Sequence, residues 1–157
     1  MWLYSLAIKC SGAIEENPGP KPNSCEYLSI CHWNLNSVSA HNFIKLSLLR
    51  AYISINKIDI KRLSKTYLDS SISSDNDNLE LPGYNSVRAD NLTNTKRGNV
   101  CIYYYNSLLL KVIDIQLLNE CINFEIRIGG KLCSFLCLYR SPSQTRDIFE
   151  RFTDNFE

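Results

Sequence analysis

Two asparagines follow the first apolar run of this chain at a spacing that suits a shared site. Residues 27–33 are largely apolar, and Asn34 and Asn36 come directly after them. Because alternate residues of an extended strand point to the same face, both amides would face one way at the end of a buried strand. Asparagine after a strand is also common as a turn residue, so the pair alone leaves both interpretations open.

Three other side chains near this strand are of the types that serve as bases or nucleophiles. Cys31 and His32 lie within the run itself, and His41 lies where the first turn of a following helix is expected. No carboxylate that could orient either imidazole stands nearby in the sequence, so we interpret both histidines as packed or surface side chains. Cys31 belongs to the apolar face of the strand and is interpreted as a packing residue.

Four further motifs follow the first strand in a fixed order along the chain. They are Leu63-Ser64-Lys65-Thr66-Tyr67-Leu68, Leu81-Pro82-Gly83-Tyr84, Arg97-Gly98-Asn99-Val100 and Tyr139-Arg140-Ser141-Pro142. This order resembles the endonuclease/exonuclease/phosphatase superfamily, whose fold is DNase-I-like. Within the superfamily it is most similar to the endonuclease domain of LINE-like, non-LTR retrotransposon proteins. The resemblance covers residues 26–157.

The resemblance implies roles for several of these positions. Asn34 matches the family's asparagine in the phosphate and metal site, and Asn36 falls where related nucleases often carry Asp or Asn. Tyr139 matches the tyrosine that lies against the phosphate, with Arg140 after it as a second phosphate contact. The family cleaves DNA phosphodiesters with Mg²⁺, which binds the scissile oxygens while a general base activates water. DNA is therefore the implied partner, Mg²⁺ the implied metal, and no small-molecule cofactor is expected.

Lys65 stands where the family has the glutamate that is its main metal ligand. An ammonium about 4 Å from a divalent cation is repelled by roughly 8 kcal/mol at an effective dielectric constant of about 20. We therefore expect Lys65 to exclude the metal, although it could hold a phosphate as a point charge. The family's Gly-Asp-x-Asn and Ser-Asp-His motifs, which supply the water-activating carboxylate and the base, have no counterpart before Glu157.

These departures lead to three interpretations of function. The first is the amino-terminal half of a retrotransposon endonuclease, truncated before its second half and catalytically inactive. The second is a binding module that holds a nucleic-acid backbone through Asn34, Lys65, Tyr139 and Arg140 without cutting it. The third is the product of a decayed element that has no function.

Residues 1–25 are predicted to be a tail ahead of the domain at residues 26–157. The tail contains Glu15-Glu16-Asn17-Pro18-Gly19-Pro20, which resembles the end of the 2A-type ribosome-skipping peptides that some non-LTR retrotransposons carry. In that family the bond corresponding to Gly19–Pro20 is not formed. Ala13 departs from the family's Asp, and a plain Pro/Gly/Asn-rich linker is the alternative. The apolar residues 1–8 lack the positive flank of a secretory signal.

Composition sets further bounds on the class of protein. Seventeen Lys and Arg against 16 Asp and Glu give a net charge of +1, so no global basic field indicates nucleic acid. The seven cysteines form no CxxC pair and fall largely in apolar strand patterns, which favours reduced core thiols in an intracellular protein. No apolar run approaches the length of a transmembrane helix, and no membrane association is expected.

The periodicity of the sequence predicts an α/β fold, a partial DNase-I-like sandwich. Residues 40–55 have apolar positions at Ile44, Leu48, Tyr52 and Ile55 with Leu49 beside them, which indicates an amphipathic helix with Ser39 as candidate N-cap. This helix and its flanking strands form a βαβ unit, so those strands should be parallel. One mixed sheet is expected to include residues 27–33, Val100–Tyr105, 122–128 and 132–139. Further strands are expected at residues 58–63, 84–88 and 111–115.

Two features of this scheme carry expectations about stability. Lys61 and Arg62 interrupt a strand that should be buried on both faces, so an unpaired charge would cost several kcal/mol or the strand would twist outward. In the family, most of a second sheet would come from the half beyond residue 157. An uncovered sheet face would make the chain poorly soluble, or dependent on that half or on a partner chain.

Overall fold

The computed structural model describes residues 5–11, 28–37, 43–68, 79–90, 98–116 and 120–139. These residues form eight strands and one helix. The elements, in chain order, are β1 Ser5–Ser11, β2 Ile30–Asn34, α1 Ile44–Ile55, β3 Ile60–Ser64, β4 Tyr84–Ala89, β5 Val100–Tyr105, β6 Leu110–Gln116, β7 Cys121–Ile128 and β8 Lys131–Leu138.

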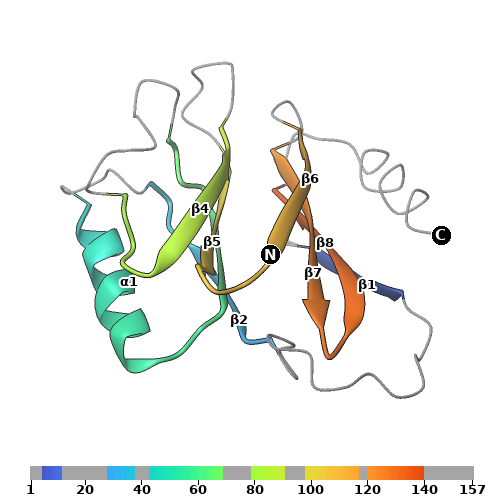
Figure 1. Cartoon of the computed structure of the whole chain (residues 1–157). Coiled ribbons are helices and arrows are strands. Elements are labelled where there is room, and N and C mark those ends of the chain that lie inside the picture. Colours follow the sequence, from blue (N-terminus) through green and yellow to red (C-terminus); the bar gives the residue numbers. More distant parts are fainter. Residues whose placement is uncertain are drawn as a thin grey trace.

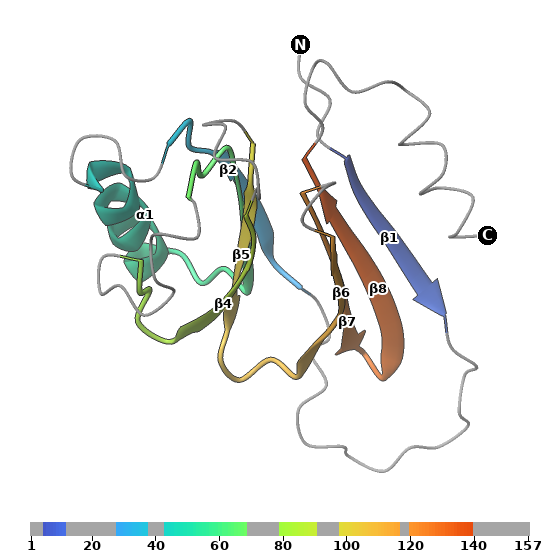
Figure 2. The same cartoon turned by 90° about the horizontal axis from the view of Figure 1, so that it is seen from above.

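The strands form two four-stranded sheets that pack against each other, with α1 on the outer side of one of them (Figures 1 and 2). One sheet has the order β2-β3-β5-β4 and the other the order β1-β8-β7-β6. The predicted α/β sandwich is confirmed. The assignment of residues 122–128 and 132–139 to the same sheet as β2 and β5 is wrong, because β6, β7 and β8 pair with one another as antiparallel neighbours.

A four-stranded second sheet packs on the first within the described residues, so at least part of it is present before residue 157. Part of its width comes from Ser5–Ser11, which pairs antiparallel with β8 from Ser5↔Leu138 to Ser11↔Leu132. A segment predicted to be a tail therefore supplies an edge strand. The predicted domain boundary at residue 26 stays a prediction.

The predicted βαβ unit is confirmed. β2 and β3 are parallel, with Ile30 opposite Ile60 and Asn34 opposite Ser64. α1 connects them, which is the usual crossover for a parallel pair. The parallel register brings the carboxyl ends of both strands to the same end of the sheet. The candidate site lies at this end.

The helix begins at Ile44, and Phe43 occupies the N-cap position with a left-handed backbone and no side-chain cap. Residues 38–42, including Ser39 and His41, lie outside the described residues. The helix packs on its sheet through Leu46 and Leu49, which are fully buried. The row predicted as its apolar face, Ile44, Leu48, Tyr52 and Ile55, is exposed instead.

The space between the sheets holds one apolar cluster. Ile60 and Ile102 contribute from one sheet, and Phe124 and Phe135 stack from the other with ring centroids 5.2 Å apart. The Gly129-Gly130 hairpin is confirmed, with positive φ at both residues as a two-residue turn of this kind requires. β8 is central in its sheet, as its apolar sequence predicts.

Lys61 and Arg62 are buried rather than turned outward, with 0% and 3% of their surface exposed. The Lys61 ammonium donates to the Ile58 carbonyl and lies 3.1 Å from the centroid of the Tyr84 ring. The Arg62 guanidinium crosses between the sheets and donates to the Leu138 carbonyl. Each charge therefore has polar or π contacts inside the protein, which is the condition under which a buried charge is tolerated.

The buried ammonium makes stability depend on pH in a defined direction. Burial lowers the pKa of Lys61 to about 8 from an ordinary value of 10.5, while Cys31 and Asp59 act in the opposite sense. Between these two values the unfolded state binds more protons than the native state. The contribution of Lys61 to the free energy of unfolding therefore rises as pH increases through this interval.

We expect Lys61→Met to be at least as stable as the wild type at pH 7. Its free energy of unfolding should not show the increase with pH that Lys61 contributes in the wild type. The Ile58 carbonyl would keep the hydrogen bond from the Tyr84 hydroxyl, at 2.8 Å. Urea unfolding from pH 7 to 10 measures the effect as a difference from wild type, with the exposed Lys57→Met as control. A wild-type pH dependence that persists in Lys61→Met would contradict it.

The interpretation of the cysteines as core thiols is confirmed for Cys101, Cys121, Cys133 and Cys137, which are buried and form no disulfide among the described residues. Burial raises the pKa of Cys101 and Cys121 to about 12 and of Cys137 to about 11. These thiols stay protonated at neutral pH and act as small apolar groups.

No helix in the described part of the chain is long and apolar enough to span a membrane.

Candidate phosphate-binding site

Strand ends from both sheets meet at one end of the sandwich, which we call the site end. The Leu35 amide donates to the Ser64 carbonyl at 3.0 Å, and this joins the chain after β2 to the end of β3. The amide of Asn99, just before β5, donates to Glu120 Oε2 at 2.8 Å. The Tyr139 amide, just after β8, donates to the Glu120 carbonyl at 3.1 Å. Glu120 thus connects the two sheets at this end.

Asn34 and Asn36 lie at the exit of β2 and are both exposed. Asn34 still belongs to the strand, whereas Asn36 has a left-handed backbone with φ 49°. The Asn36 carbonyl accepts a hydrogen bond from Lys45 of α1, and its Oδ1 accepts one from the Tyr67 hydroxyl at 2.9 Å. Asn36 is therefore partly a turn residue, as the alternative interpretation allows, while Asn34 remains at the strand end.

Lys65 follows directly after β3 and lies beside the exit of β2. Its backbone is left-handed, with φ 53°, and its carbonyl accepts a hydrogen bond from the Ser37 amide at 2.7 Å. The side chain is half-buried. The β2–β3 register places Asn34 opposite Ser64, one residue before Lys65. The structure therefore brings Asn34 and Lys65 to neighbouring strand ends.

Tyr139 comes from the facing sheet, so the prediction that it joins Asn34 and Lys65 at one sheet edge is wrong. It follows β8 at the site end, is only 4% exposed and packs in the apolar cluster between the sheets. The physical reason is the division into two sheets, which places these strands opposite each other rather than side by side. Arg140 lies outside the described residues. The roles that the resemblance implies for Tyr139 and Arg140 stay predictions.

Sequence reasoning missed the pair formed by Glu120 and Gly98. Gly98 has φ +88°, and a Cβ placed on it would lie 1.9 Å from a Glu120 carboxylate oxygen. The carboxylate therefore packs directly on the glycine backbone and accepts from the next amide, Asn99. Glycine in the Arg97-Gly98-Asn99-Val100 motif was the available signal, because a motif glycine often marks a close approach.

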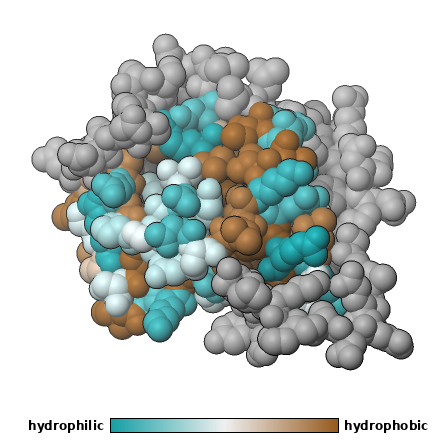
Figure 3. All heavy atoms as spheres, viewed as in Figure 1, coloured by the Kyte–Doolittle hydropathy of each residue, from teal (hydrophilic) through white to brown (hydrophobic). Residues whose placement is uncertain are grey.

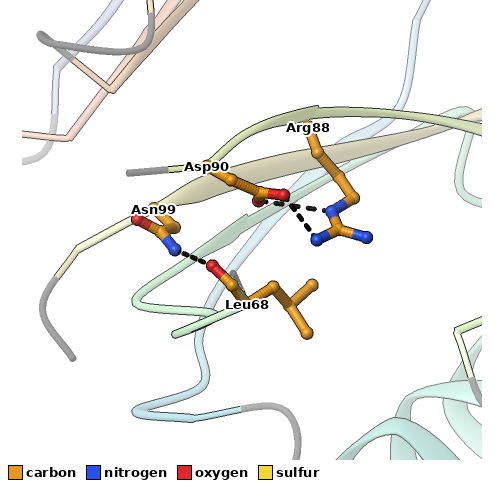
Figure 4. Close-up of polar contacts among 4 residues, drawn as sticks. All are labelled: Leu68, Arg88, Asp90 and Asn99. Atoms are coloured by element: carbon orange, nitrogen blue, oxygen red, sulfur yellow. Dashed lines mark hydrogen bonds and ion pairs between the residues drawn. The ribbon is translucent and has the colours of Figure 1, made fainter. Parts of the chain in front are cut away.

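Asn99 and Asp90 are also held in fixed contacts at this end. The Asn99 side-chain amide donates to the Leu68 carbonyl, and the Arg88 guanidinium pairs with the Asp90 carboxylate (Figure 4). These contacts join the segment after β3 to the start of β5 and fix the end of β4. The two carboxylates described at this end, Glu120 and Asp90, therefore both bind groups of the protein itself.

His32 and Arg62 lie opposite each other in the β2–β3 register, with His32 exposed on the edge strand and Arg62 buried. His32 Nε2 lies 3.0 Å from Ser64 Oγ. Burial and the Arg62 guanidinium lower the pKa of His32 to about 4 from an ordinary value of 6.5. The imidazole is therefore neutral at physiological pH and contributes no positive charge to the site. This agrees with its interpretation as a packed or surface side chain.

The described residues do not fit the Mg²⁺ that the resemblance implies. Asn34 and Asn36 offer only neutral amide oxygens, and Asn36 Oδ1 already accepts from Tyr67. Lys65 brings a cation to the end of β3, whereas magnesium is bound in proteins through carboxylates. Among the described residues, no group of three His, Cys, Asp or Glu side chains is placed to hold a metal ion. We derive no catalytic step through magnesium.

Comparison with known proteins defines the class of fold. No protein-family model matches the chain, and no curated protein sequence matches it. Among solved structures, the chain is similar to an AP endonuclease from Leishmania major, with a TM-score of 0.61 and 15% sequence identity. The match covers 80% of this chain and 44% of that one, so the chain spans less than half of that enzyme's length. The chain therefore has a DNase-I-like fold.

Proposed function

We propose that this chain binds the phosphate backbone of a nucleic acid at the site end without cleaving it. Asn34 and Lys65 would be the principal contacts, with Asn36, Tyr139 and Arg140 completing the set. The observation that carries the proposal is the placement of Lys65 beside Asn34 at the carboxyl ends of two parallel strands. An ammonium and an amide both donate hydrogen bonds to phosphate oxygens, and neither needs a bound metal to do so.

The proposal is supported by the fold, because one of the solved structures similar to it is an AP endonuclease. We infer that the chain corresponds to the amino-terminal half of a nuclease of this kind. Its proposed origin in a LINE-like non-LTR retrotransposon rests on the ordered motifs from Asn34 to Pro142. The proposed ribosome skipping at Gly19–Pro20 rests on residues 15–20 alone.

Lys65→Ala should weaken DNA binding and reduce its dependence on salt. We expect the wild-type chain to bind a labelled duplex weakly, with log Kd rising linearly with log salt concentration as phosphate contacts release counterions. Removing one phosphate contact should lower that slope by about 0.9. Fluorescence anisotropy at several salt concentrations between about 50 and 200 mM measures both quantities in the range where such contacts are sensitive to salt.

Lys57→Ala is the matched control for that experiment. Lys57 is exposed and precedes β3, so it lies at the opposite end of the strand from Lys65. The same net charge is lost in both variants, and only Lys65→Ala should change the slope by a full contact. Equal binding by wild type and Lys65→Ala would overturn the proposed site. Failure of the wild type to bind DNA at low salt would favour a chain without this function.

A further inference from the structure

α1 has two apolar faces, of which only one is used by the fold. Leu46 and Leu49 point to the sheet and are fully buried. On the opposite side, Ile44, Leu48, Tyr52 and Ile55 are 53%, 56%, 47% and 83% exposed. Together with the exposed Ser47 and Ala51 they form what we call the outer face of α1. Brown patches, interspersed with teal and white, lie along the left of Figure 3, where α1 lies in Figure 1.

The outer face carries no charge. The two charged residues of α1 lie at its borders and are both engaged with neighbouring backbone. Lys45 donates to the carbonyls of Leu35 and Asn36, and Arg50 donates to the Glu80 carbonyl at 2.7 and 3.0 Å. A surface helix normally presents charged and polar residues to water on the side away from the core, and the outer face of α1 lacks charged residues. This composition indicates that the outer face is covered by another surface.

The order of large and small residues along this face makes it complementary to itself. In an antiparallel pair of α1 helices with the two-fold axis between positions 49 and 50, Leu48 of one copy lies opposite Ala51 of the other. The same operation sets Tyr52 opposite Ser47 and Ile44 opposite Ile55. Large side chains thus meet small ones at the centre, as ridges-into-grooves packing requires. We infer that the occupant of the outer face is a second copy of this chain, related by a two-fold axis.

Charge and size further define this interface. Lys45 and Arg50 lie at the borders of the outer face and donate to backbone carbonyls, so no charge stands at the centre of the interface, and nothing on the face itself would attract a nucleic-acid backbone. A helix that binds a membrane surface instead presents Lys and Arg on its polar side. One short helix per copy is smaller than the roughly 800 Å² per partner of a standard interface. The dimer should therefore be weak and concentration-dependent.

Sedimentation equilibrium of the full chain tests the proposal. We expect reversible dimerisation of the wild type, with a Kd in the range of about 1 μM to 1 mM. Leu48→Glu and Ala51→Lys should each raise the dimer Kd at least about tenfold, because each buries an unpaired charge at the centre of the interface. Both positions are exposed in the single chain, so thermal melts should show that both variants fold.

Mixing the two variants makes the test specific for this geometry. In the mixed dimer, Glu at position 48 of one chain faces Lys at position 51 of the other, while the remaining Leu48–Ala51 contact is native. The mixture should therefore form heterodimers under conditions in which each variant alone is monomeric. Leu109→Glu is the control, because it removes another exposed leucine away from α1 and should dimerise like the wild type.

Three outcomes would overturn the inference. They are a wild type that stays monomeric up to millimolar concentration, a Leu109→Glu control that fails to dimerise, and a mixture that does not associate. Monomeric protein that binds neutral lipid vesicles through Leu48 would instead identify a membrane surface as the occupant. None of these outcomes depends on DNA binding, so the experiments test the proposed function and the proposed dimer independently.

Discussion

Supercoiled plasmid incubated with the full chain and Mg²⁺ or Mn²⁺ is expected to remain unnicked from pH 6 to 9. The physical reason is Lys65, which follows β3 and stands where the resemblance implies a metal-binding carboxylate. Hydrolysis of a phosphodiester in this fold needs a cation on the scissile oxygens and a base that activates water. The Gly-Asp-x-Asn and Ser-Asp-His motifs, which the resemblance implies for that base and its carboxylate, have no counterpart in these 157 residues.

Restoring the carboxylate should separate metal binding from cutting. We expect Lys65→Glu to gain weak Mn²⁺ binding, measured by calorimetry, and still to leave the plasmid intact. Lys65→Ala removes the positive charge without adding a ligand and is the control for the gain of metal affinity. Metal-dependent nicking by the wild-type chain that persists through repurification would refute the prediction. Cutting by Lys65→Glu alone would show that a base is present within the chain.

Gly98→Ala should destabilise the protein severely. A Cβ at this position would lie 1.9 to 2.3 Å from three atoms of the Glu120 carboxyl group, and the backbone has φ +88°. The left-handed backbone alone costs a non-glycine residue about 1–2 kcal/mol. Displacing a buried carboxylate that accepts from the Asn99 amide adds to that cost, so we expect a total loss of about 3 kcal/mol or more. Urea unfolding followed by circular dichroism measures it.

Gly130→Ala is a matched control for the backbone term. Gly130 has a similar positive φ of +78°, but a Cβ there would have no neighbour within 4 Å. We expect this variant to lose only the backbone contribution, about 1–2 kcal/mol. The difference between the two variants isolates the contact between Gly98 and Glu120. Equal losses in both would show that the carboxylate moves aside without cost.

Local patterns in the sequence determined most of the strands. β5 has the predicted bounds, β7 and β8 differ from prediction by one residue, and the two-glycine turn between them follows from alternation and turn chemistry. The parallel pairing of β2 with β3 also followed from sequence, because a strand, a helix and a strand in succession form a parallel crossover. These features depend on residues that are close together along the chain, so they can be predicted from the sequence.

The sequence could not decide which face of α1 is buried. Apolar residues lie on both sides of this helix, so periodicity predicts an apolar row without saying which row meets the sheet. In the tertiary structure Leu46 and Leu49 are buried against the sheet. The residues of the other row, Ile44, Leu48, Tyr52 and Ile55, are exposed. Lys61 was beyond sequence reasoning for a related reason. The carbonyl of Ile58 and the ring of Tyr84 that accommodate its charge come together only when β3 and β4 are in place.

The candidate site divides in the same way. The sequence determined that Asn34 and Lys65 follow two strands of one parallel unit, and hence that they lie at neighbouring strand ends. Only the tertiary structure decided that Tyr139 approaches from a facing sheet and that Glu120 links the two sheets through Asn99 and Tyr139. Which strands belong to which sheet, and how the two sheets pack, depends on apolar faces contributed by distant segments of the chain. Contacts of that kind do not appear as a periodic pattern in the sequence.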